Sequence, residues 1–192
     1  MARITIIDGH PDPDPARFIH ALADAYAAGA EEGIHEVRRI DVATLDFPIL
    51  RSAKEWRETT PAKAIHDAQI DIRWADHLVI LFPLWLGDVP ALFKAFLEQT
   101  MRPGFAIDET VPDRKAKLLC GRSARVVVTM GMPAPFYRYY YRAHSLKSLA
   151  RNLLGFTGIA PVRHSIIGSV EASDGDRQHW LGLVRELGRD AR

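Results

Sequence analysis

The sequence predicts an α/β fold, a doubly wound five-stranded parallel sheet with helices on both faces, formed by residues 1–192 as a single domain. Strand-like and helix-like segments alternate along the whole chain, so that five βα units follow one another. The central strand, residues 77–82 (HLVILF), is apolar throughout, which is typical of a parallel strand covered on both faces. No internal repeat, low-complexity tract or long linker separates two domains.

Two strands and two helices are predicted before the central strand. Residues 4–8 form a short β-branched run that ends at Gly9-His10-Pro11. Residues 18–32 carry apolar side chains on one helical stripe and end at a glycine. Residues 35–42 have an imperfect strand pattern, and a helix follows from about 61 to 74. These segments alternate as a parallel sheet requires.

A polar stretch at 51–60 leads to the helix at about 61–74. The elements expected after the central strand are, in order, a helix at 91–100, a long loop at 102–117, a strand at 125–129, a helix at 146–154, a strand at 162–167, and a final helix at 173–187 with Asp174 near its cap.

Charge and composition restrict the class of partner. The 25 basic residues nearly balance the 24 acidic ones, so a net charge of +1 gives no electrostatic reason to expect nucleic acid. No segment approaches the ~20 apolar residues of a membrane span, and we expect no integral membrane segment. The single cysteine, Cys120, has no partner for a disulfide, which favours a cytoplasmic location. It also has no neighbouring His or Cys at the spacing of metal ligands.

In parallel α/β sheets, ligands bind at the carboxyl ends of the strands, where the strand order reverses. The residues that matter are therefore expected in three loops, at 10–18, 83–90 and 129–137, after the first, third and fourth strands. The sequence thus predicts one site built from segments that are far apart along the chain.

The first loop precedes a helix, whose N-terminal amides form an anion site to which His10 and Arg17 can add donors. Neither a G-x-G-x-x-G fingerprint nor a P-loop lysine is present. Asp12 and Asp14 are expected to point to solvent. Together with His10 they do not converge on one point, so no metal site is predicted. A capped loop without a ligand is the alternative interpretation.

The second and third loops supply apolar and hydroxyl groups. Trp85 with its flanking leucines suits a flat aromatic ligand, and core packing or a dimer contact is the competing interpretation. In the third loop Gly131 allows backbone amides to approach a ligand closely. The following Tyr139 and Tyr140 are more typical of a surface helix or an interface.

Several motifs, in this order and spacing, resemble the NAD(P)H:quinone oxidoreductase family, flavodoxin-like proteins that include quinone reductases and ancillary subunits of bacterial potassium-efflux systems. The motifs are Gly9-His10-Pro11 with Phe18, Phe82-Pro83-Leu84-Trp85 with Val89-Pro90-Ala91-Leu92-Phe93-Lys94, Arg102-Pro103-Gly104-Phe105-Ala106, and Val128-Thr129 with Gly131 and Tyr137.

The resemblance implies a flavodoxin-like fold and a flavin-dependent oxidoreductase that passes hydride from NAD(P)H to a quinone-like acceptor by a ping-pong mechanism. The implied cofactor is FMN, with FAD as the alternative, and the implied assembly is a homodimer with active sites at the subunit boundary. The implied cofactor-binding residues are His10, Arg17, Phe18, Pro83, Leu84, Trp85, Leu86, Thr129, Gly131 and Met132, and the candidate catalytic residues are Tyr137 and His144.

The chain departs from the family pattern at three places, one of which is the spacing of His144 after Tyr137, where members often carry a histidine. The first loop reads Ala16-Arg17-Phe18-Ile19, where members carry a small hydroxyl residue, Phe and Asn, and Met132 replaces the second of two adjacent glycines. These changes favour, as an alternative function, a flavin-binding regulatory subunit with little turnover. A receiver-like signalling domain is rejected, because Phe82-Pro83 stands where an aspartate is required.

Overall fold

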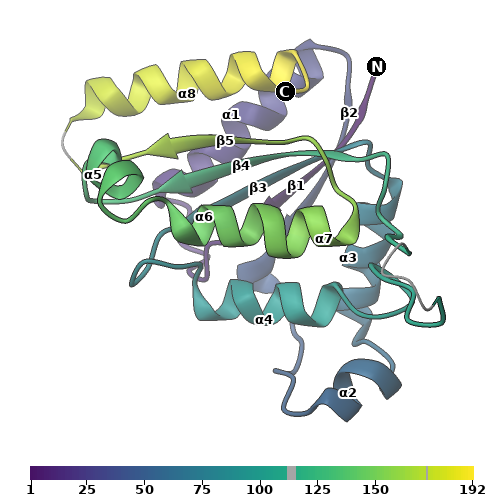
Figure 1. Cartoon of the computed structure of the whole chain (residues 1–192). Coiled ribbons are helices and arrows are strands. Elements are labelled where there is room, and N and C mark those ends of the chain that lie inside the picture. The colour runs from purple at the N-terminus through teal and green to yellow at the C-terminus, as the bar shows by residue number, and fades with distance from the viewer. Residues whose placement is uncertain (112–115, 172) are drawn as a thin grey trace.

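Five parallel strands form one sheet in the order β2-β1-β3-β4-β5 (Figure 1). The computed structural model describes residues 1–111, 116–171 and 173–192. The strands are β1 (Arg3–Asp8), β2 (Glu36–Asp41), β3 (His77–Pro83), β4 (Ser123–Thr129) and β5 (Val162–Ile167). This order confirms the predicted doubly wound sheet and places the reversal between β1 and β3.

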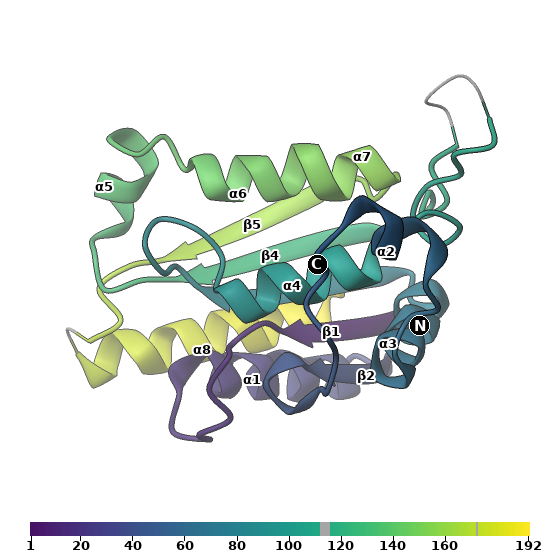
Figure 2. The same ribbon diagram turned by 90° about the horizontal axis from the view of Figure 1, so that it is seen from below.

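Helices cover both faces of the sheet (Figures 1 and 2). One face carries α1 (Phe18–Glu32) and α8 (Asp174–Arg189). The other face carries α3 (Lys63–Trp74), α4 (Ala91–Thr100) and a continuous helical segment made of α6 (His144–Ser148), the π-helical turn η2 (Leu149–Leu154) and α7 (Gly155–Thr157). Each helix presents an apolar stripe to the strands, as its periodicity requires.

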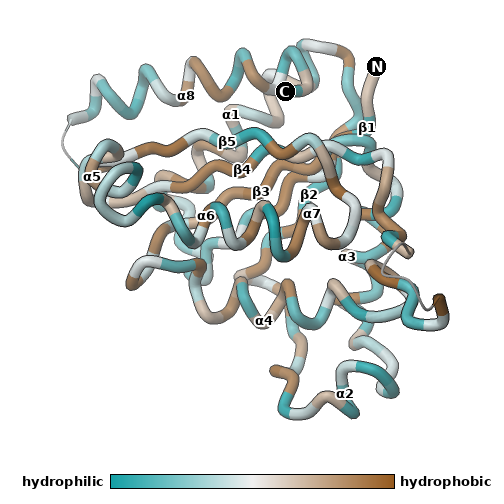
Figure 3. Tube along the Cα trace, viewed as in Figure 1, coloured by the Kyte–Doolittle hydropathy of each residue, from teal (hydrophilic) through white to brown (hydrophobic). Residues whose placement is uncertain are grey.

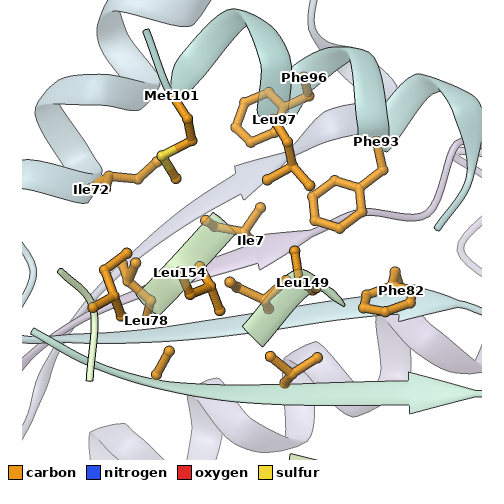
Figure 4. Packing of buried hydrophobic residues seen from close by; sticks show 14 of the residues in the cluster. Ile7, Ile72, Leu78, Phe82, Phe93, Phe96, Leu97, Met101, Leu149 and Leu154 are labelled. Atoms are coloured by element: carbon orange, nitrogen blue, oxygen red, sulfur yellow. The ribbon is translucent and has the colours of Figure 1, made fainter. Parts of the chain in front are cut away.

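Two hydrophobic cores lie on the two sides of the sheet. Hydropathy colouring shows hydrophobic residues along β3 and hydrophilic residues interspersed with hydrophobic ones along the helices (Figure 3). On the side of α3 and α4, the Phe93 ring packs at 5.7 Å from that of Phe82 and at 6.2 Å from that of Phe96, above Ile7 and Leu149 (Figure 4). Strands buried on both faces explain the continuous apolar run in β3.

On the other side, α1 and α8 cross at glycines. A Cβ atom at Gly29 would lie 1.9 Å from the carbonyl oxygen of Arg185, and one at Gly188 would lie 2.1 Å from that of Tyr26. Both positions therefore require glycine for the two helix backbones to approach this closely. The crossing sets where the first turn of α8 lies relative to the first turn of α1.

Three short elements lie outside the predicted pattern. The helix α2 (Ala53–Glu58) forms within the polar stretch at 51–60, where no element was predicted. Ser52 caps it by accepting the Glu55 N–H at 3.1 Å. The buried Arg102 donates to the carbonyl oxygens of Glu55, at 2.8 Å, and of Thr59, at 2.6 Å. A partner 43 or more residues away in sequence thus stabilises this helix.

The other two short elements are η1 (Val42–Thr44), which follows β2, and α5 (Ala134–Tyr139), which lies beside the carboxyl ends of β4 and β5 (Figure 1). Tyr139 and Tyr140 are more than two-thirds exposed, as expected of a surface helix. No helix within the described ranges is long and apolar enough to cross a lipid bilayer.

Candidate functional site at the carboxyl edge of the sheet

A cavity of about 500 Å³ lies at the carboxyl edge of the sheet, beside the reversal of strand order. Parallel register brings the strand ends together there, since Asp8 pairs with Leu81 and Pro83 with Thr129. The lining residues are His10, Asp12, Ala16, Arg17, Phe18, Ile19, Pro83, Leu84, Trp85, Thr129, Met130, Gly131, Val170, Glu171 and Arg177. A volume of this size is typical of small-molecule sites.

The lining includes most of the residues predicted to bind a cofactor. All three predicted loops contribute, together with the segment after β5. Two predicted residues lie outside the lining. Leu86 is fully exposed at the tip of a turn, and the partly buried Met132 packs against the larger core.

The first loop is ordered by a buried carboxylate at the end of β1. Asp8 is 1 % exposed, accepts the His10 N–H at 3.0 Å and lies 2.5 Å from Nδ1 of His20. Burial opposes a charge on His20, but the hydrogen bonds to Asp8 and to the Asp12 carbonyl outweigh it, so the pKa of His20 is raised. Asp8 and His20 thus form a charge-assisted pair beneath the loop.

His10 has the opposite electrostatic environment. Burial and the neighbouring His20 charge lower the pKa of His10, which favours the neutral ring. Its Nδ1 lies 3.0 Å from the Asp12 amide nitrogen and 3.1 Å from the Asp12 carbonyl oxygen, so the ring is held against the backbone of Asp12. The ring packs edge-on against Trp85 at 5.8 Å between centroids. His10 therefore presents a neutral ring at the cavity lining, with Nδ1 bonded to Asp12.

The other side chains of this loop pair with one another. Nε and Nη2 of Arg17 lie 2.8 and 2.6 Å from Oδ2 of Asp12, and Nη2 lies 3.4 Å from Oδ2 of Asp14. The Asp12 and Asp14 side chains remain 39 % and 46 % exposed, as expected of groups that point to solvent, and they also pair with Arg17. Each also accepts a loop amide at 3.0 Å through Oδ1, Asp12 from Asp14 and Asp14 from Ala16.

The wall of the second loop is a tight hairpin that presents an aromatic ring. Trp85 and Asp88 exchange backbone hydrogen bonds of 2.9 and 3.0 Å, and Leu86 and Gly87 between them both have positive φ, at 49° and 84°. This is the geometry of a type I′ turn. The hairpin leaves the Trp85 side chain 48 % exposed at the cavity.

The third loop supplies open space beside this wall. The Thr129 carbonyl accepts the Leu84 N–H at 2.8 Å, which joins the second and third loops. A Cβ atom added at Gly131 would have no neighbouring atom within 4 Å, so the cavity is open above this backbone. A side chain there would project into space that a ligand can use.

The two candidate catalytic residues lie outside the cavity lining. Tyr137 is 1 % exposed, and its hydroxyl lies 2.6 Å from Oγ of Ser145 and accepts the Leu146 N–H at 3.3 Å. His144 is exposed and lines a separate shallow cavity with Arg142, Lys147 and Arg151. The structure therefore brings neither residue to the lining formed by the three predicted loops.

The segment after β5 contributes residues that sequence reasoning missed. Val170, Glu171 and Arg177 line the cavity next to the first loop. Arg177 lies in the first turn of α8, with its guanidinium 5.5 Å from the centroid of the Phe18 ring. The only sequence signal was the predicted start of a helix at Ser173, which does not show what that helix end packs against.

A metal centre is not suggested by the arrangement of side chains. Within residues 1–111, 116–171 and 173–192, no three His, Cys, Asp or Glu side chains converge as metal ligands do. Asp8 and His10 instead form hydrogen bonds inside the first loop.

Comparison with known proteins decides the family. A family model described as a flavodoxin-like fold matches residues 2–183. The chain belongs to this flavodoxin-like family. A ribosyldihydronicotinamide dehydrogenase-like protein of Penicillium crustosum is 25 % identical to it, over 86 % of this chain and 67 % of that protein. An uncharacterised NAD(P)H oxidoreductase of Haemophilus influenzae is also 25 % identical, over 88 % of this chain and 85 % of that protein.

Solved structures agree with the flavodoxin-like assignment. An NAD(P)H:quinone oxidoreductase from Methanothermobacter marburgensis superposes with a TM-score of 0.83 at 22 % identity, covering 99 % of this chain and 96 % of that one. An FMN-dependent NADH-azoreductase from Bacillus anthracis, in complex with FMN, gives a TM-score of 0.74 at 17 % identity, covering 98 and 99 %. Identities this low show the shared fold, and the resemblance seen in the sequence motifs is confirmed at the level of the family.

Proposed function

We propose that this flavodoxin-like protein is a flavin-dependent NAD(P)H oxidoreductase that reduces quinones or similar small acceptors. The observation that carries the proposal is the cavity at the carboxyl edge, in which Trp85 and Gly131 form one open wall and the first turn of α1 lies at the other end. Relatives named as NAD(P)H oxidoreductases support the same assignment.

The wall end of the cavity fits a planar ring system. The half-exposed Trp85 and the adjacent Leu84 present apolar surface, and the backbone at Gly131 leaves room for close approach. Such a site binds a ring by burial of apolar area and by backbone amides at the ring edge. We refer to this part, formed by Pro83–Trp85 and Thr129–Gly131, as the ring end.

The opposite part fits a phosphate. The amides of Phe18 and Ile19 begin α1, and neither has an acceptor among the described residues. The neutral His10 lines this part of the cavity together with Arg17 and Arg177. We refer to these residues, with Asp12, as the anion end.

A flavin bound here would supply the hydride chemistry, because it accepts and returns a hydride at its ring. The residues of this chain bind and orient. Trp85 and Leu84 would exclude water from one side of the bound ring, and the backbone amides near Gly131 would be the donors available to charge that develops on it. We infer that NAD(P)H and the acceptor use the same open side of the ring end in turn, which gives ping-pong kinetics.

The proton for the acceptor is not assigned to Tyr137 or His144, because neither lines the cavity. We propose that Tyr137 is instead a positioning residue. Its hydroxyl connects α5 to Ser145 at the start of α6 and so fixes the segment that follows the third loop. Water reaching the open ring end is the proposed proton source.

The finer assignments are part of the same proposal. We propose FMN as the cofactor, because the described lining provides one anion end next to one ring end. We propose a homodimer that covers the open side, since Trp85 and Leu86 expose apolar surface at the cavity rim. The single exposed Cys120, which forms no disulfide, is consistent with a cytoplasmic location.

The experiment is a spectrum followed by an assay. The purified protein is expected to be yellow or to become so with added FMN, the released flavin is identified by mass, and NADH or NADPH is consumed with a small quinone. A protein that takes up neither FMN nor FAD contradicts the proposal. Bound flavin without turnover supports the regulatory alternative, which the self-paired Arg17 in the first loop also favours.

A further inference from the structure

Two arginines face the anion end from opposite elements of the fold. Arg17 immediately precedes α1, and Arg177 lies in the first turn of α8. Both line the same cavity, so either could balance the charge of a phosphate. Which of them is available depends on the partners that each already has.

Arg17 is already paired with carboxylates of its own loop. Two of its nitrogens contact Asp12 at 2.6 and 2.8 Å, and one of these also lies 3.4 Å from Asp14. Hydrogen bonding by the Asp14 amide and by Arg17 keeps the pKa of Asp12 below its usual value, so this carboxylate stays ionised. The same two aspartates also take up the amides of Asp14 and Ala16.

The Arg17 guanidinium and two amides of the first loop thus already donate to carboxylates of the same loop. A phosphate that used Arg17 would have to displace two carboxylates or share the guanidinium with them, and the three like charges would repel one another. Arg17 therefore acts mainly as the counter-ion that holds the first loop in its observed shape.

Arg177 is held in place without being neutralised. Its Nε donates to the Val170 carbonyl at 2.7 Å, and its guanidinium lies over the Phe18 ring. The nearest ion pair, to Asp174, is 3.9 Å long, and the Asp174 side chain is 99 % exposed, so this contact is weak. Within the described part of the chain, no hydrogen-bond acceptor contacts the terminal nitrogens of Arg177. Two further carboxylates lie on this side: Glu171 lines the cavity and is exposed, and Asp176 accepts the Ser173 hydroxyl at 2.8 Å.

We propose that Arg177, and not Arg17, is the residue by which this protein selects a phosphorylated flavin over one without a phosphate. The inference rests on the proposed function and specifies which residue of the anion end binds the phosphate of the flavin. Arg177 contacts the anion, whereas Arg17 is a positioning residue for the loop. Arg177 lies in the first turn of α8, and the position of α8 depends on its close packing against α1 at Gly29 and Gly188.

The test compares FMN with riboflavin, which has the same ring but no phosphate. Dissociation constants are measured from the quenching of flavin fluorescence for the wild type, Arg177→Gln and Arg17→Gln. We expect Arg177→Gln to weaken FMN binding about tenfold or more, the loss of a charge-assisted hydrogen bond, and to leave riboflavin within twofold. We expect Arg17→Gln to change FMN binding by less than about threefold.

The riboflavin constant and the far-UV circular dichroism spectrum serve as controls for folding. If Arg17→Gln costs as much FMN affinity as Arg177→Gln, or if neither substitution changes it, the inference is wrong. If Arg177→Gln weakens both flavins equally, Arg177 has only a structural role, and the inference is again wrong. A wild type that binds neither flavin refutes the proposed function itself, which is a separate result.

Discussion

The ring end and the anion end of the cavity are built by different means. The ring end consists of residues that directly follow β3 and β4, joined by a 2.8 Å backbone hydrogen bond between Leu84 and Thr129. The anion end lies between the starts of α1 and α8. There Arg17 pairs with Asp12 at 2.6 Å, and Arg177 lies 3.9 Å from Asp174. The ring end is thus fixed by the sheet itself, while the anion end depends on helix packing and on how charges pair.

This difference teaches where specificity is set. Apolar area at the ring end gives affinity for any ligand with a suitable flat ring, because burial of area is not directional. Recognition at the anion end is directional and depends on which cation is unpaired. Substitutions at the ring end are therefore expected to change the affinity for every flavin. Substitutions at the anion end are expected to change the preference for FMN over riboflavin.

The largest effect is expected from breaking the helix crossing that places the anion end. Gly29→Ala puts a Cβ atom against the Arg185 backbone, which has no flexible side chain to move aside. We expect the free energy of unfolding in urea to fall by about 3 kcal/mol, the upper end of overpacking effects. In the protein that stays folded, the preference for FMN over riboflavin is expected to shrink.

Gly182→Ala on α8 is the matched control. Its Cβ meets no atom within 4 Å, so the same substitution is expected to raise the unfolding free energy by about 0.5–1 kcal/mol through helix propensity. Equal effects at Gly29 and Gly182 would show that the close crossing does not exist in solution.

The second prediction concerns the pH dependence of the unfolding free energy, at a histidine that lies away from the cavity. His77 lies at the start of β3, at the edge opposite the cavity, and burial together with the charges of Arg125 and Arg163 lowers its pKa to about 4. Because the unfolded state binds this proton more readily, the contribution of His77 is complete above about pH 6.5 and is lost as the pH falls toward 4. We expect a loss of about 3 kcal/mol over this window.

His77→Gln retains an amide that can reach Ser123, the partner of His77 at 2.7 Å, but does not titrate. The slope of unfolding free energy against pH between 4 and 6.5 is expected to be smaller in this variant. The raised pKa of His20 has the opposite sign, because its contribution is present at low pH and is lost as the pH rises through its folded pKa. An unchanged slope in His77→Gln would contradict the assignment.

The ring end is tested by removing its aromatic wall. Trp85→Ala is expected to weaken FMN and riboflavin together by about tenfold to a hundredfold, because most of the apolar contact is lost while the anion end is untouched. Fluorescence titration with both flavins measures this. Ile34→Asn, at an exposed position with φ 59° just after α1 and outside the cavity lining, is the control and is expected to leave both constants unchanged. A changed FMN-to-riboflavin ratio in Trp85→Ala would show that the two ends are not independent.

The smallest effect is expected at Tyr137, outside both ends. Tyr137→Phe removes a 2.6 Å hydrogen bond and leaves Ser145 without its partner, so the unfolding free energy is expected to fall by about 1 kcal/mol. Flavin affinity and NAD(P)H turnover are expected to stay within twofold. A large fall in turnover with flavin fully bound would instead make Tyr137 catalytic. Tyr140→Phe, on an exposed side chain, is the control for stability.

The amino-acid sequence by itself determined the five strands, their parallel arrangement and the three loops that line the cavity. Apolar runs such as residues 77–82 are local properties, and parallel strands necessarily bring the segments after them to one edge. His10, Trp85 and Gly131 could therefore be placed at the site without knowledge of any contact between them.

Only the tertiary structure decided which side chains are available at that site. Arg17 is paired within its loop, Tyr137 points to Ser145, and Arg177 reaches the cavity from a helix more than 150 residues after the first loop. The physical reason is that pairing and orientation depend on distances across the fold. The approach of α1 and α8 at Gly29 and Gly188 is set by packing of whole helices, which no local pattern in the sequence encodes.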